Sequence, residues 1–562
     1  MIDAPLTFAG LFHARRDDDH AALLFEQRSW TWREVLAECD RRAAFLRRRV
    51  PLPTGRPIHV GILLENVPDF VFWIGAAAIT GSVVVGLNST RRGDELAADI
   101  RHTDCDVLIT ETWGLALLDR QRVGVARDRI LDIDDPDYAL LLAQESEPET
   151  LTDVTPRDSD TLLLLFSSGS TGVPKAVVCS QGRLARLAHA LGDRMEIHRE
   201  TVTYLCMPLF HGNSLMTNLA PVVRAGATVA IARKFSASRL IPDIRCYGAT
   251  YWNFVGRAVA YALATERQAD DADTPLRLAY GTEASARDAA EFAERFGCRV
   301  MQGYGASEGV LRINRVPGTP EGSMGLPVGD SLVVIIDDQG NESVPAEFDE
   351  NGMLLNPKQA IGQMVVRGGA ANFEGYYNNP DAMEERVHGS DFWTGDLAYR
   401  DADGFLYFSG RTTDWIRVDG ENLAVAPIER LIEGYPAVSQ AVVYGIPDAR
   451  TSDQVMATLS LTPGARFDAD EFGSFLTSQP GLGTKWLPHL IRCTNDLPST
   501  ANGKISRPAL REQAWATDDP VWVWSAATRE YTVLTPELRH ALVNSFHEHG
   551  REHLLPESIR DA

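Results

Sequence analysis

The sequence has few cysteines, fewer basic than acidic residues, and no long uninterrupted hydrophobic run. Its 562 residues include seven cysteines, none in a CxxC pair. Neither a zinc site nor a disulfide framework is therefore indicated, and we expect reduced, mostly buried thiols. Lys and Arg number 54 against 77 Asp and Glu, a net charge of −23. Because an acidic surface repels phosphate backbones, this composition argues against a nucleic-acid-binding protein.

Neither a membrane span nor a secretion signal is indicated. The longest apolar stretch, residues 71–87, is interrupted by the polar and flexible sequence Thr80-Gly81-Ser82. The part before this break suits a helix and the part after it suits a strand, so the stretch predicts a core unit. The first twenty residues lack a basic start followed by a long apolar run. We therefore expect a cytoplasmic protein.

Strand-like and helix-like segments alternate along most of the chain, which is typical of α/β proteins with largely parallel sheets. At roughly 150 residues per domain, the length predicts three or four domain-sized units. From about residue 410 the composition changes and a second strand–helix series begins. We therefore expect a large N-terminal domain over 1–410, with mixed α/β sheets flanked by helices, and a small α+β domain over 411–511.

Residues 512–562 form an extension of different composition. Three tryptophans lie close together in it: Trp515, Trp522 and Trp524. Thr535-Pro536-Glu537 is typical of a helix start, and three apolar residues then share one stripe: Leu538, Leu542 and Phe546. We expect this helix to pack against the body of the protein, and a partner-binding appendage is the alternative.

The segment 161–175, TLLLLFSSGSTGVPK, is an apolar strand that runs directly into a loop of small polar residues. Small residues let backbone N–H groups converge on an anion, hydroxyl groups add donors, and Lys175 adds positive charge. The spacing differs from the GxxxxGK[ST] loop of GTPases, and a Ser/Gly loop is otherwise an ordinary turn. We predict a phosphate-binding loop that contains Ser167, Ser168, Gly169, Ser170, Thr171 and Gly172.

With this loop the sequence resembles the adenylate-forming superfamily, which includes acyl-CoA synthetases, luciferases and nonribosomal adenylation domains. Further motifs follow in that superfamily's order: PLFHGN (208–213), YGASE (304–308), GSMGLP (322–327), GYYNNP (375–380), FWTGDLAYRDADGFLYFSGR (392–411), VDGENLAVAPIER (418–430) and PSTANGKISR (498–507). The resemblance spans about residues 20–511. LFHGN and DGEN make it closest to fatty-acid and very-long-chain acyl-CoA synthetases.

The resemblance implies a two-step reaction with ATP, Mg²⁺ and CoA. A carboxylate attacks the α-phosphate of ATP to give an acyl-adenylate and pyrophosphate, and a thiol then displaces AMP. It also implies that the small domain is mobile, so that two orientations serve the two steps. We therefore expect an acid–thiol ligase whose partners are CoA and a hydrophobic carboxylic acid.

Four residues are implied to be catalytic. Lys504 and Lys175 would stabilise charge on the phosphates, and Glu308 would bind Mg²⁺ as a hard oxygen ligand. His211 of LFHGN would gate the path between the acyl and CoA sites, whereas an isolated histidine at a strand end is otherwise a structural residue.

The resemblance also implies the nucleotide and CoA contacts. Tyr304 would stack on adenine, Asp396 would accept hydrogen bonds from the ribose, and Arg411 would contact ribose or phosphate. Further nucleotide contacts fall on Gly281, Thr282, Glu283, Gly305 and Ser307. CoA would pass the DGEN segment at Gly420, Glu421 and Asn422.

The acyl pocket is expected around the segment 251–255 and the turns near 280 and 310, with Trp252, Asn253, Tyr280 and Val310. These residues are mostly bulky and apolar, which favours a hydrophobic acid over acetate. Whether the acid is a linear fatty acid or a rigid polycyclic one, such as a terpenoid or steroid carboxylate of secondary metabolism, stays open.

Four residues depart from the superfamily's pattern: Ala176, Gln181, Gln363 and Thr413. Thr413 occupies the hinge position, where a threonine still serves because a hinge depends on backbone torsions. Ala176 replaces a glycine at the end of the phosphate loop and motivates a hypothesis. Adenylation would be impaired, and the enzyme would mainly convert an acyl-adenylate supplied by an upstream enzyme. A neutral substitution is the simpler interpretation, and loading of a carrier protein is a further alternative.

The sequence Gly305-Ala306-Ser307-Glu308-Gly309 also reads as the G-x-S-x-G nucleophile elbow of α/β hydrolases. That motif requires a long helix immediately after it. The following residues contain Pro317 and Pro320 and no helical apolar stripe. A serine hydrolase is therefore disfavoured.

Overall fold

The structure is a computed structural model of the whole chain. It describes all residues except 1–5, 119–121, 145–154, 168–174, 283, 285, 330, 351, 353, 412–415, 419–420, 424, 450–452, 480–481, 483–485, 500–504 and 561–562. The chain separates into two compact units, the first comprising 1–312, 371–385 and 501–503, the second the remaining residues. The domain boundary predicted at residues 410 and 411 stays a prediction.

The first unit contains a sheet in the order β6-β5-β3-β4-β7-β8, parallel except for the last strand. Its strands are β3 (His59–Leu63), β4 (Val83–Gly86), β5 (Val107–Thr110), β6 (Ile130–Asp132), β7 (Thr161–Ser167) and β8 (Lys175–Ser180). The predicted helix–strand unit is confirmed, because α3 (Pro68–Thr80) ends at Gly81 and β4 follows. Gly81 has φ +69°, which glycine adopts without steric cost.

A second sheet of this unit runs in the order β13-β12-β11-β9-β10-β1-β2 and is parallel except for the β1–β2 pair. Its strands are β1 (Ala21–Phe25), β2 (Arg28–Thr31), β9 (Val202–Leu205), β10 (Thr228–Ile231), β11 (Tyr251–Val255), β12 (Leu278–Thr282) and β13 (Arg299–Gly305). Most of these strands are buried on both faces, which explains their continuous apolar runs.

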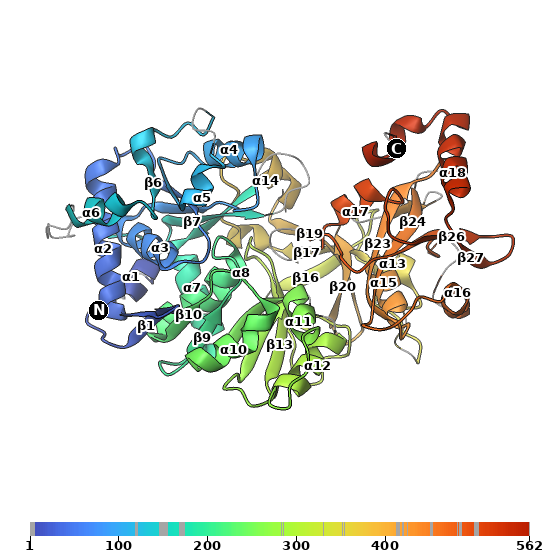
Figure 1. Cartoon of the computed structure of the whole chain (residues 1–562), viewed down its shortest axis with the longest axis horizontal. Coiled ribbons are helices and arrows are strands. Elements are labelled where there is room, and N and C mark those ends of the chain that lie inside the picture. The colour runs from blue at the N-terminus through green and yellow to red at the C-terminus, as the bar shows by residue number, and fades with distance from the viewer. Residues whose placement is uncertain are drawn as a thin grey trace. The chain divides into compact units, whose positions relative to one another are not determined.

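Helices form layers around both sheets (Figure 1). Side chains from both sheets share one core with α1 (Phe8–His13), α2 (Trp32–Arg49), α3, α7 (Gln181–Arg194) and α9 (Ala220–Ala225). The outer face of the first sheet packs against α4 (Gly93–His102). The outer face of the second packs against α10 (Ala237–Tyr247), α11 (Gly256–Leu263) and α12 (Ala286–Phe296).

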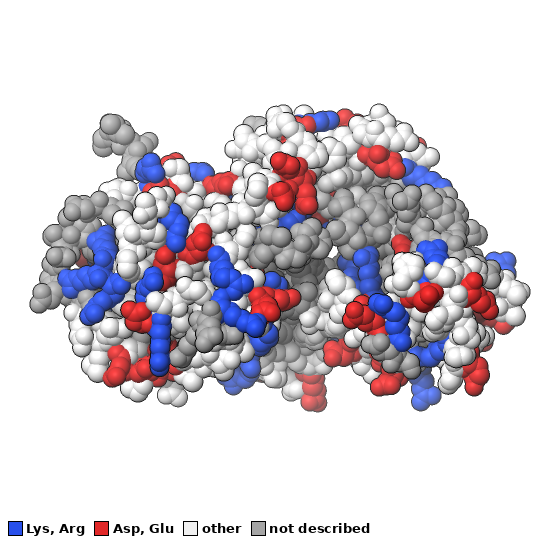
Figure 2. All heavy atoms as spheres, turned by 90° about the horizontal axis from the view of Figure 1, so that it is seen from above, with Lys and Arg blue, Asp and Glu red and all other residues white. Residues whose placement is uncertain are grey.

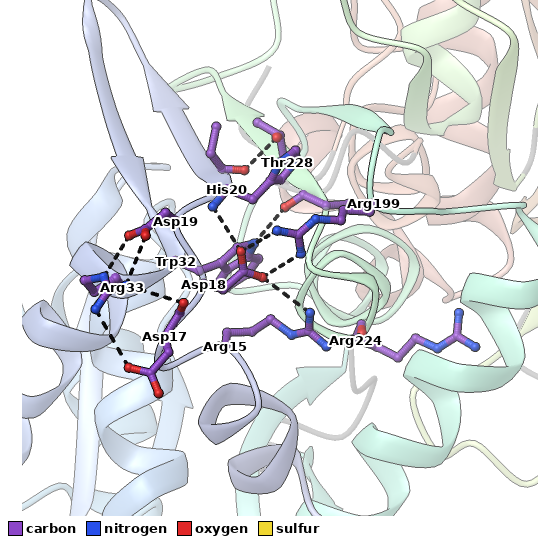
Figure 3. A network of polar contacts seen from close by, with 12 residues as sticks. Arg15, Asp17, Asp18, Asp19, His20, Trp32, Arg33, Arg199, Arg224 and Thr228 are labelled. Atoms are coloured by element: carbon purple, nitrogen blue, oxygen red, sulfur yellow. Dashed lines mark hydrogen bonds and ion pairs between the residues drawn. The ribbon is translucent and has the colours of Figure 1, made fainter.

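An ion network fixes the chain between α1 and β1 (Figure 3). The Asp18 carboxylate accepts hydrogen bonds from Arg199 at 2.5 and 2.7 Å, from Arg15 at 3.4 Å and from the His20 backbone at 3.0 Å. The hydrogen bonds from Arg199 hold the pKa of Asp18 well below its usual range. Asp18 therefore contributes to stability as a carboxylate.

The second unit contains several groups of antiparallel strands and one mixed sheet. One sheet has the order β16-β17-β19-β18, with β20 beside β19, and β14 (Arg312–Asn314) pairs with β15 (Leu326–Pro327). The sheet strands are β16 (Leu332–Ile336), β17 (Gly362–Arg367), β18 (Val387–His388), β19 (Asp391–Arg400) and β20 (Leu406–Arg411). A separate hairpin joins β21 (Ile416–Val418) to β22 (Glu421–Leu423).

The remaining sheet of the second unit includes the C-terminal extension. Its order is β23-β24-β25-β26-β27, with β23 (Val438–Pro447), β24 (Asp453–Leu461), β25 (Leu490–Cys493), β26 (Val521–Ser525) and β27 (Glu530–Val533). One face packs against α15 (Val425–Glu433) and α16 (Ala469–Ser478). The other packs against α17 (Arg507–Gln513), α18 (Pro536–Glu548) and α19 (Glu557–Arg560).

The predicted helix of the extension is confirmed as α18. Thr535 caps it by accepting a hydrogen bond from the Leu538 backbone, and Pro536 is its first residue. Phe546 is 1% exposed and packs against Trp515, with ring centroids 6.5 Å apart. The same hydrophobic cluster includes Val442 and Tyr444 of β23, so α18 packs on the sheet that β23 belongs to.

Two expectations from composition can be checked directly. Within the described part of the chain, no helix is long and apolar enough to span a membrane. All seven cysteines lie in that part as free thiols, and five of them are buried. Figure 2 shows basic and acidic side chains interspersed over the face that it presents, in line with the many Arg–carboxylate pairs.

Candidate active site

The predicted phosphate loop joins two paired strands of the first sheet. β7 and β8 are antiparallel, and Ser167 at the end of β7 lies opposite Lys175 at the start of β8. The strand before the loop is thus where the sequence predicts it. Five loop residues lie outside the described part of the chain: Ser168, Gly169, Ser170, Thr171 and Gly172. Of Ser167, only the backbone is described.

Lys175 is 6% exposed, and its ammonium group lies 2.7 Å from the Glu385 carboxylate. Glu385 belongs to α14 (Pro380–Arg386), on a segment that the first unit includes although the chain on both sides of it belongs to the second. The cation at the end of the phosphate loop is therefore balanced by a carboxylate. Sequence reasoning missed this partner, because nothing in the local pattern of α14 indicates it.

Ala176 follows Lys175 in β8, opposite Phe166. Because successive strand residues point to opposite faces, its methyl group points away from the face of Lys175. The methyl group is fully buried in the hydrophobic cluster that includes Val85 and Leu164. An alanine in place of the superfamily's glycine at position 176 therefore adds an apolar contact in a strand. This geometry lends no support to the hypothesis of an impaired adenylation step.

Glu308 lies in the turn after β13 and is held by a tyrosine. The hydroxyl group of Tyr376, in the GYYNNP motif, donates a hydrogen bond of 2.7 Å to Glu308 Oε1. The chain continues into β14 and not into a helix, so the serine-hydrolase interpretation is excluded. The sequence analysis noted the GYYNNP motif but gave Tyr376 no role.

The Glu308 carboxylate is a suitable ligand for a magnesium ion. Mg²⁺ is usually held by one or two carboxylates together with substrate phosphates, so the single Glu308 carboxylate is compatible with such a site. In the described ranges, no group of three or more His, Cys, Asp or Glu side chains could hold a metal by itself.

The LFHGN motif lies beside both the phosphate-loop strand and the Glu308 turn. His211 is half-buried and caps α8 (Gly212–Ser214), with Nδ1 accepting a hydrogen bond of 3.4 Å from the Asn213 backbone. A Cβ on Gly212 would lie 3.5 Å from Leu165 Cδ1 and 3.7 Å from Ser307 Oγ. Three motifs that are far apart in the sequence thus meet here.

Trp252 and Asn253, both expected in the acyl pocket, lie on opposite faces of β11, because successive strand residues alternate. Their assignment to the acyl pocket stays a prediction. Trp252 is fully buried among Phe235, Phe254 and Phe292, on the side of α11 and α12. Asn253 and its neighbour Tyr280 on β12 face the other side, since they are in register. Val310 is 6% exposed, beside the Glu308 turn.

Asn253 belongs to a buried chain of polar side chains. Asn218 Nδ2 donates to Asn253 Oδ1 at 2.8 Å, and Asn253 Nδ2 donates to Asn213 Oδ1 at 2.8 Å. Asn218 lies in a π-helical turn, residues Leu215–Leu219, a geometry often found at functional sites. The sequence pattern that could have indicated this polar chain is the presence of asparagines within an otherwise largely apolar run, NSLMTNLAPVV.

A cavity of about 300 Å³ adjoins the LFHGN motif where parallel strands end. Its largely apolar walls include Asn66, Met207, Phe210, Lys234, Phe235 and Val255. In open α/β sheets, ligands bind at the carboxyl ends of strands, so this is the expected kind of place. Sequence reasoning did not predict it.

The remaining residues that are predicted to contact the nucleotide lie at strand ends. Gly281 and Thr282 end β12, and a Cβ on Gly281 would collide with the Phe254 carbonyl oxygen, so glycine is required there. Tyr304 and Gly305 end β13. Glu283 lies outside the described residues.

In the second unit, Asp396 on β19 lies opposite Arg411 on β20, with Oδ1 and Nε 3.6 Å apart. Thr413, Gly420 and Lys504 lie outside the described residues. Glu421 and Asn422 are described only as the backbone of β22. The predicted hinge, CoA contact and catalytic lysine therefore stay predictions.

The sequence matches the family described as "AMP-binding enzyme" over residues 12–377, and its "AMP-binding enzyme C-terminal domain" over residues 427–504. The chain belongs to this family. The resemblance stated from the motifs is thereby confirmed.

Two relatives are similar to this chain over nearly their whole length. A "Steroid-22-oyl-CoA synthetase" of Rhodococcus jostii (strain RHA1) is 45% identical over 98% of this chain and 99% of its own. A "Medium/long-chain-fatty-acid--CoA ligase FadD17" of Mycobacterium marinum (strain ATCC BAA-535 / M) is 40% identical over 89% of this chain and 95% of its own. Both bear the names of acid–thiol ligases.

Solved structures confirm the predicted fold class. The anthranilate CoA ligase AuaEII in complex with anthranoyl-AMP has a TM-score of 0.76 and 22% identity, over 91% of this chain and 98% of its own. ATP-bound MatB from Rhodopseudomonas palustris has a TM-score of 0.77 and 22% identity, over 91% and 99%. At 22% identity, the similarity to these two structures is evidence for the fold alone.

Proposed function

We propose that this chain joins a hydrophobic carboxylic acid to CoA through an acyl-adenylate. One carboxylate oxygen attacks the α-phosphorus of ATP, and pyrophosphate leaves. The sulfur of CoA then attacks the acyl carbonyl carbon, and AMP leaves with the shared oxygen. As an acid–thiol ligase of its family, the chain uses ATP, Mg²⁺ and CoA. The observation that carries the proposal is the 45% identity to a steroid-22-oyl-CoA synthetase over almost the full length of both chains.

For the acid, we propose a steroid side-chain carboxylate first and a medium- or long-chain fatty acid second. The relative at 45% identity is named for a steroid acyl group, and those at 40% for fatty acids. Both groups are apolar, and so are most walls of the cavity beside Phe210. Burying a large apolar acyl group there contributes roughly 25 cal/mol per Å² of apolar surface.

The phosphates would lie at the loop between β7 and β8. Backbone N–H groups of a small-residue loop and the Lys175 ammonium stabilise negative charge that spreads over oxygens in the transition state. Lys175 is already held at the loop end by Glu385. The loop therefore has a cation in place before the nucleotide binds.

Glu308 would hold Mg²⁺ through a carboxylate oxygen. When bound, the metal neutralises charge on the phosphates. Tyr376 donates to Oε1 of Glu308, so the side chain is oriented and its other oxygen can face the ligand. Asp396 and Arg411 are proposed at the ribose, Lys504 at the α-phosphate, and His211 between the acyl and CoA paths.

The test is a panel of acids, each incubated with ATP, Mg²⁺ and CoA, with thioesters detected by mass spectrometry. The panel contains a C22 steroid side-chain acid, saturated fatty acids of several lengths, benzoate and acetate. We expect thioesters of the steroid acid first and of the fatty acids second, and none of acetate. Glu308→Gln, which removes the carboxylate charge, is the inactive control.

Three results would contradict the proposal. The absence of any thioester of a hydrophobic acid refutes the activity itself. A thioester only from supplied acyl-adenylate refutes the ATP-dependent step and supports an upstream adenylating enzyme. Transfer only to the phosphopantetheinyl group of a carrier protein refutes free CoA as the acceptor.

A further inference from the structure

Arg183 is a buried arginine next to the Glu308 turn, and neither the family motifs nor the proposed function gives it a role. It lies in the first turn of α7, directly after β8, and is 7% exposed. Helical side chains lean toward the N-terminus of their helix, so its guanidinium reaches back over the end of β8. Nη1 donates to the Val178 carbonyl at 2.9 Å, and Nη2 donates to the Ser307 carbonyl.

The contact with Ser307 acts on the residue directly before Glu308. Gly309, directly after Glu308, has φ +71°, and a Cβ there would collide with the Arg183 guanidinium. The turn that carries Glu308 is thus wrapped closely around this cation. Its backbone can approach only because position 309 is a glycine.

Glu374 closes the arrangement from the other side. Its Oε2 lies 3.9 Å from Arg183 Nη1 and accepts a 2.7 Å hydrogen bond from the Ser180 backbone, while Oε1 accepts one of 2.5 Å from Ser180 Oγ. Two residues further along the chain, Tyr376 donates to Glu308. Residues 375–377 also pair with β8 through backbone hydrogen bonds.

Glu308 is therefore held on two sides by one connected set of contacts. Arg183 fixes its backbone, Tyr376 fixes its carboxylate, and Glu374 links the two holders. An arginine suits this place because its planar group can donate to two carbonyls while facing a carboxylate, which a lysine ammonium cannot match. We propose that Arg183, paired with Glu374, is a positioning residue that sets Glu308 for Mg²⁺–ATP and so acts on adenylation alone.

This inference rests on the proposed function. Measuring the two half-reactions separately distinguishes a failure of the inference from a failure of the proposed function. Adenylation is measured as pyrophosphate release from acid, ATP and Mg²⁺. Thioester formation is measured separately, starting from synthetic acyl-adenylate and CoA. In Arg183→Lys we expect kcat/KM for ATP to fall about ten- to hundredfold, as for loss of a hydrogen bond from a charged donor. The Mg²⁺ concentration for half-maximal rate should rise, and thioester formation from acyl-adenylate should be unchanged.

A binding measurement supplies a readout other than activity. In the wild type, Mg²⁺ added to ATP should raise the melting temperature beyond ATP alone, since binding to the folded state stabilises it. In Arg183→Lys this extra rise should shrink, while the rise with ATP alone stays. Arg186→Lys is the matched control, because Arg186 is exposed on the same helix and outside these contacts.

Each result either supports or overturns the role proposed for Arg183. An equal loss in both half-reactions, or an unchanged adenylation rate in Arg183→Lys, overturns the inference and leaves the proposed function intact. A wild type that performs neither half-reaction refutes the proposed function instead. If Arg183→Lys does not fold, Glu374→Gln replaces it, because this change removes the carboxylate charge that faces the Arg183 guanidinium. The same selective loss of adenylation is expected there, and its absence overturns the inference.

Discussion

Replacing Ala176 by glycine restores the residue usual in the superfamily at the end of the phosphate loop. The methyl group that is removed lies fully buried in a hydrophobic cluster, so its loss costs about 0.8 kcal/mol of transfer free energy. Glycine in a strand costs roughly 0.5–1 kcal/mol more through backbone entropy. We therefore expect Ala176→Gly to lower the free energy of unfolding by roughly 1.5 kcal/mol and to leave pyrophosphate release unchanged.

The assay combines urea unfolding with pyrophosphate release from the preferred acid, ATP and Mg²⁺. Ala230→Gly in β10 is a matched control, since Ala230 is equally buried in a strand of the other sheet. Both variants should lose stability, and neither should gain rate. A several-fold faster pyrophosphate release in Ala176→Gly alone would refute the reasoning and revive the hypothesis of an impaired first step.

Three further predictions concern the rest of the chain. Tyr376→Phe removes the hydrogen bond to Glu308 and should slow pyrophosphate release about tenfold, and an unchanged Mg²⁺ titration would count against this. Phe546→Ala should lower the free energy of unfolding by about 3 kcal/mol, because that ring is buried; a far smaller loss by urea titration would make α18 an appendage. Asp18→Asn should cost about 1 kcal/mol at neutral pH. Because the pKa of Asp18 is lowered on folding, its contribution is present above the unfolded pKa and is lost as pH falls below it, so wild type and variant should converge in acid.

Motif order, strand–helix alternation and local caps made much of this structure predictable. The strand before the phosphate loop is a continuous apolar run because both of its faces are buried, and such a run is readable from sequence. The start of α18 was readable because Thr535 and Pro536 are standard cap and first-turn residues. These signals are local, so one sequence suffices for them.

Contacts between distant segments were not predictable in the same way. Arg183 meets Ser307 across 124 positions, and Lys175 meets Glu385 across 210, with no periodic pattern linking either pair. That Trp252 and Asn253 point to opposite faces was readable, because side chains alternate along a strand. The hairpin 521–533 was also missed, although VWVWS has strand composition.

The most direct test of the acyl-adenylate route is isotope transfer from the acid. The preferred acid, labelled with ¹⁸O in both carboxylate oxygens, is converted with ATP, Mg²⁺ and CoA, and the AMP is examined by mass spectrometry. Attack of a carboxylate oxygen on the α-phosphorus predicts one ¹⁸O atom in each AMP and none in pyrophosphate. Unlabelled AMP formed together with the CoA thioester would contradict the account.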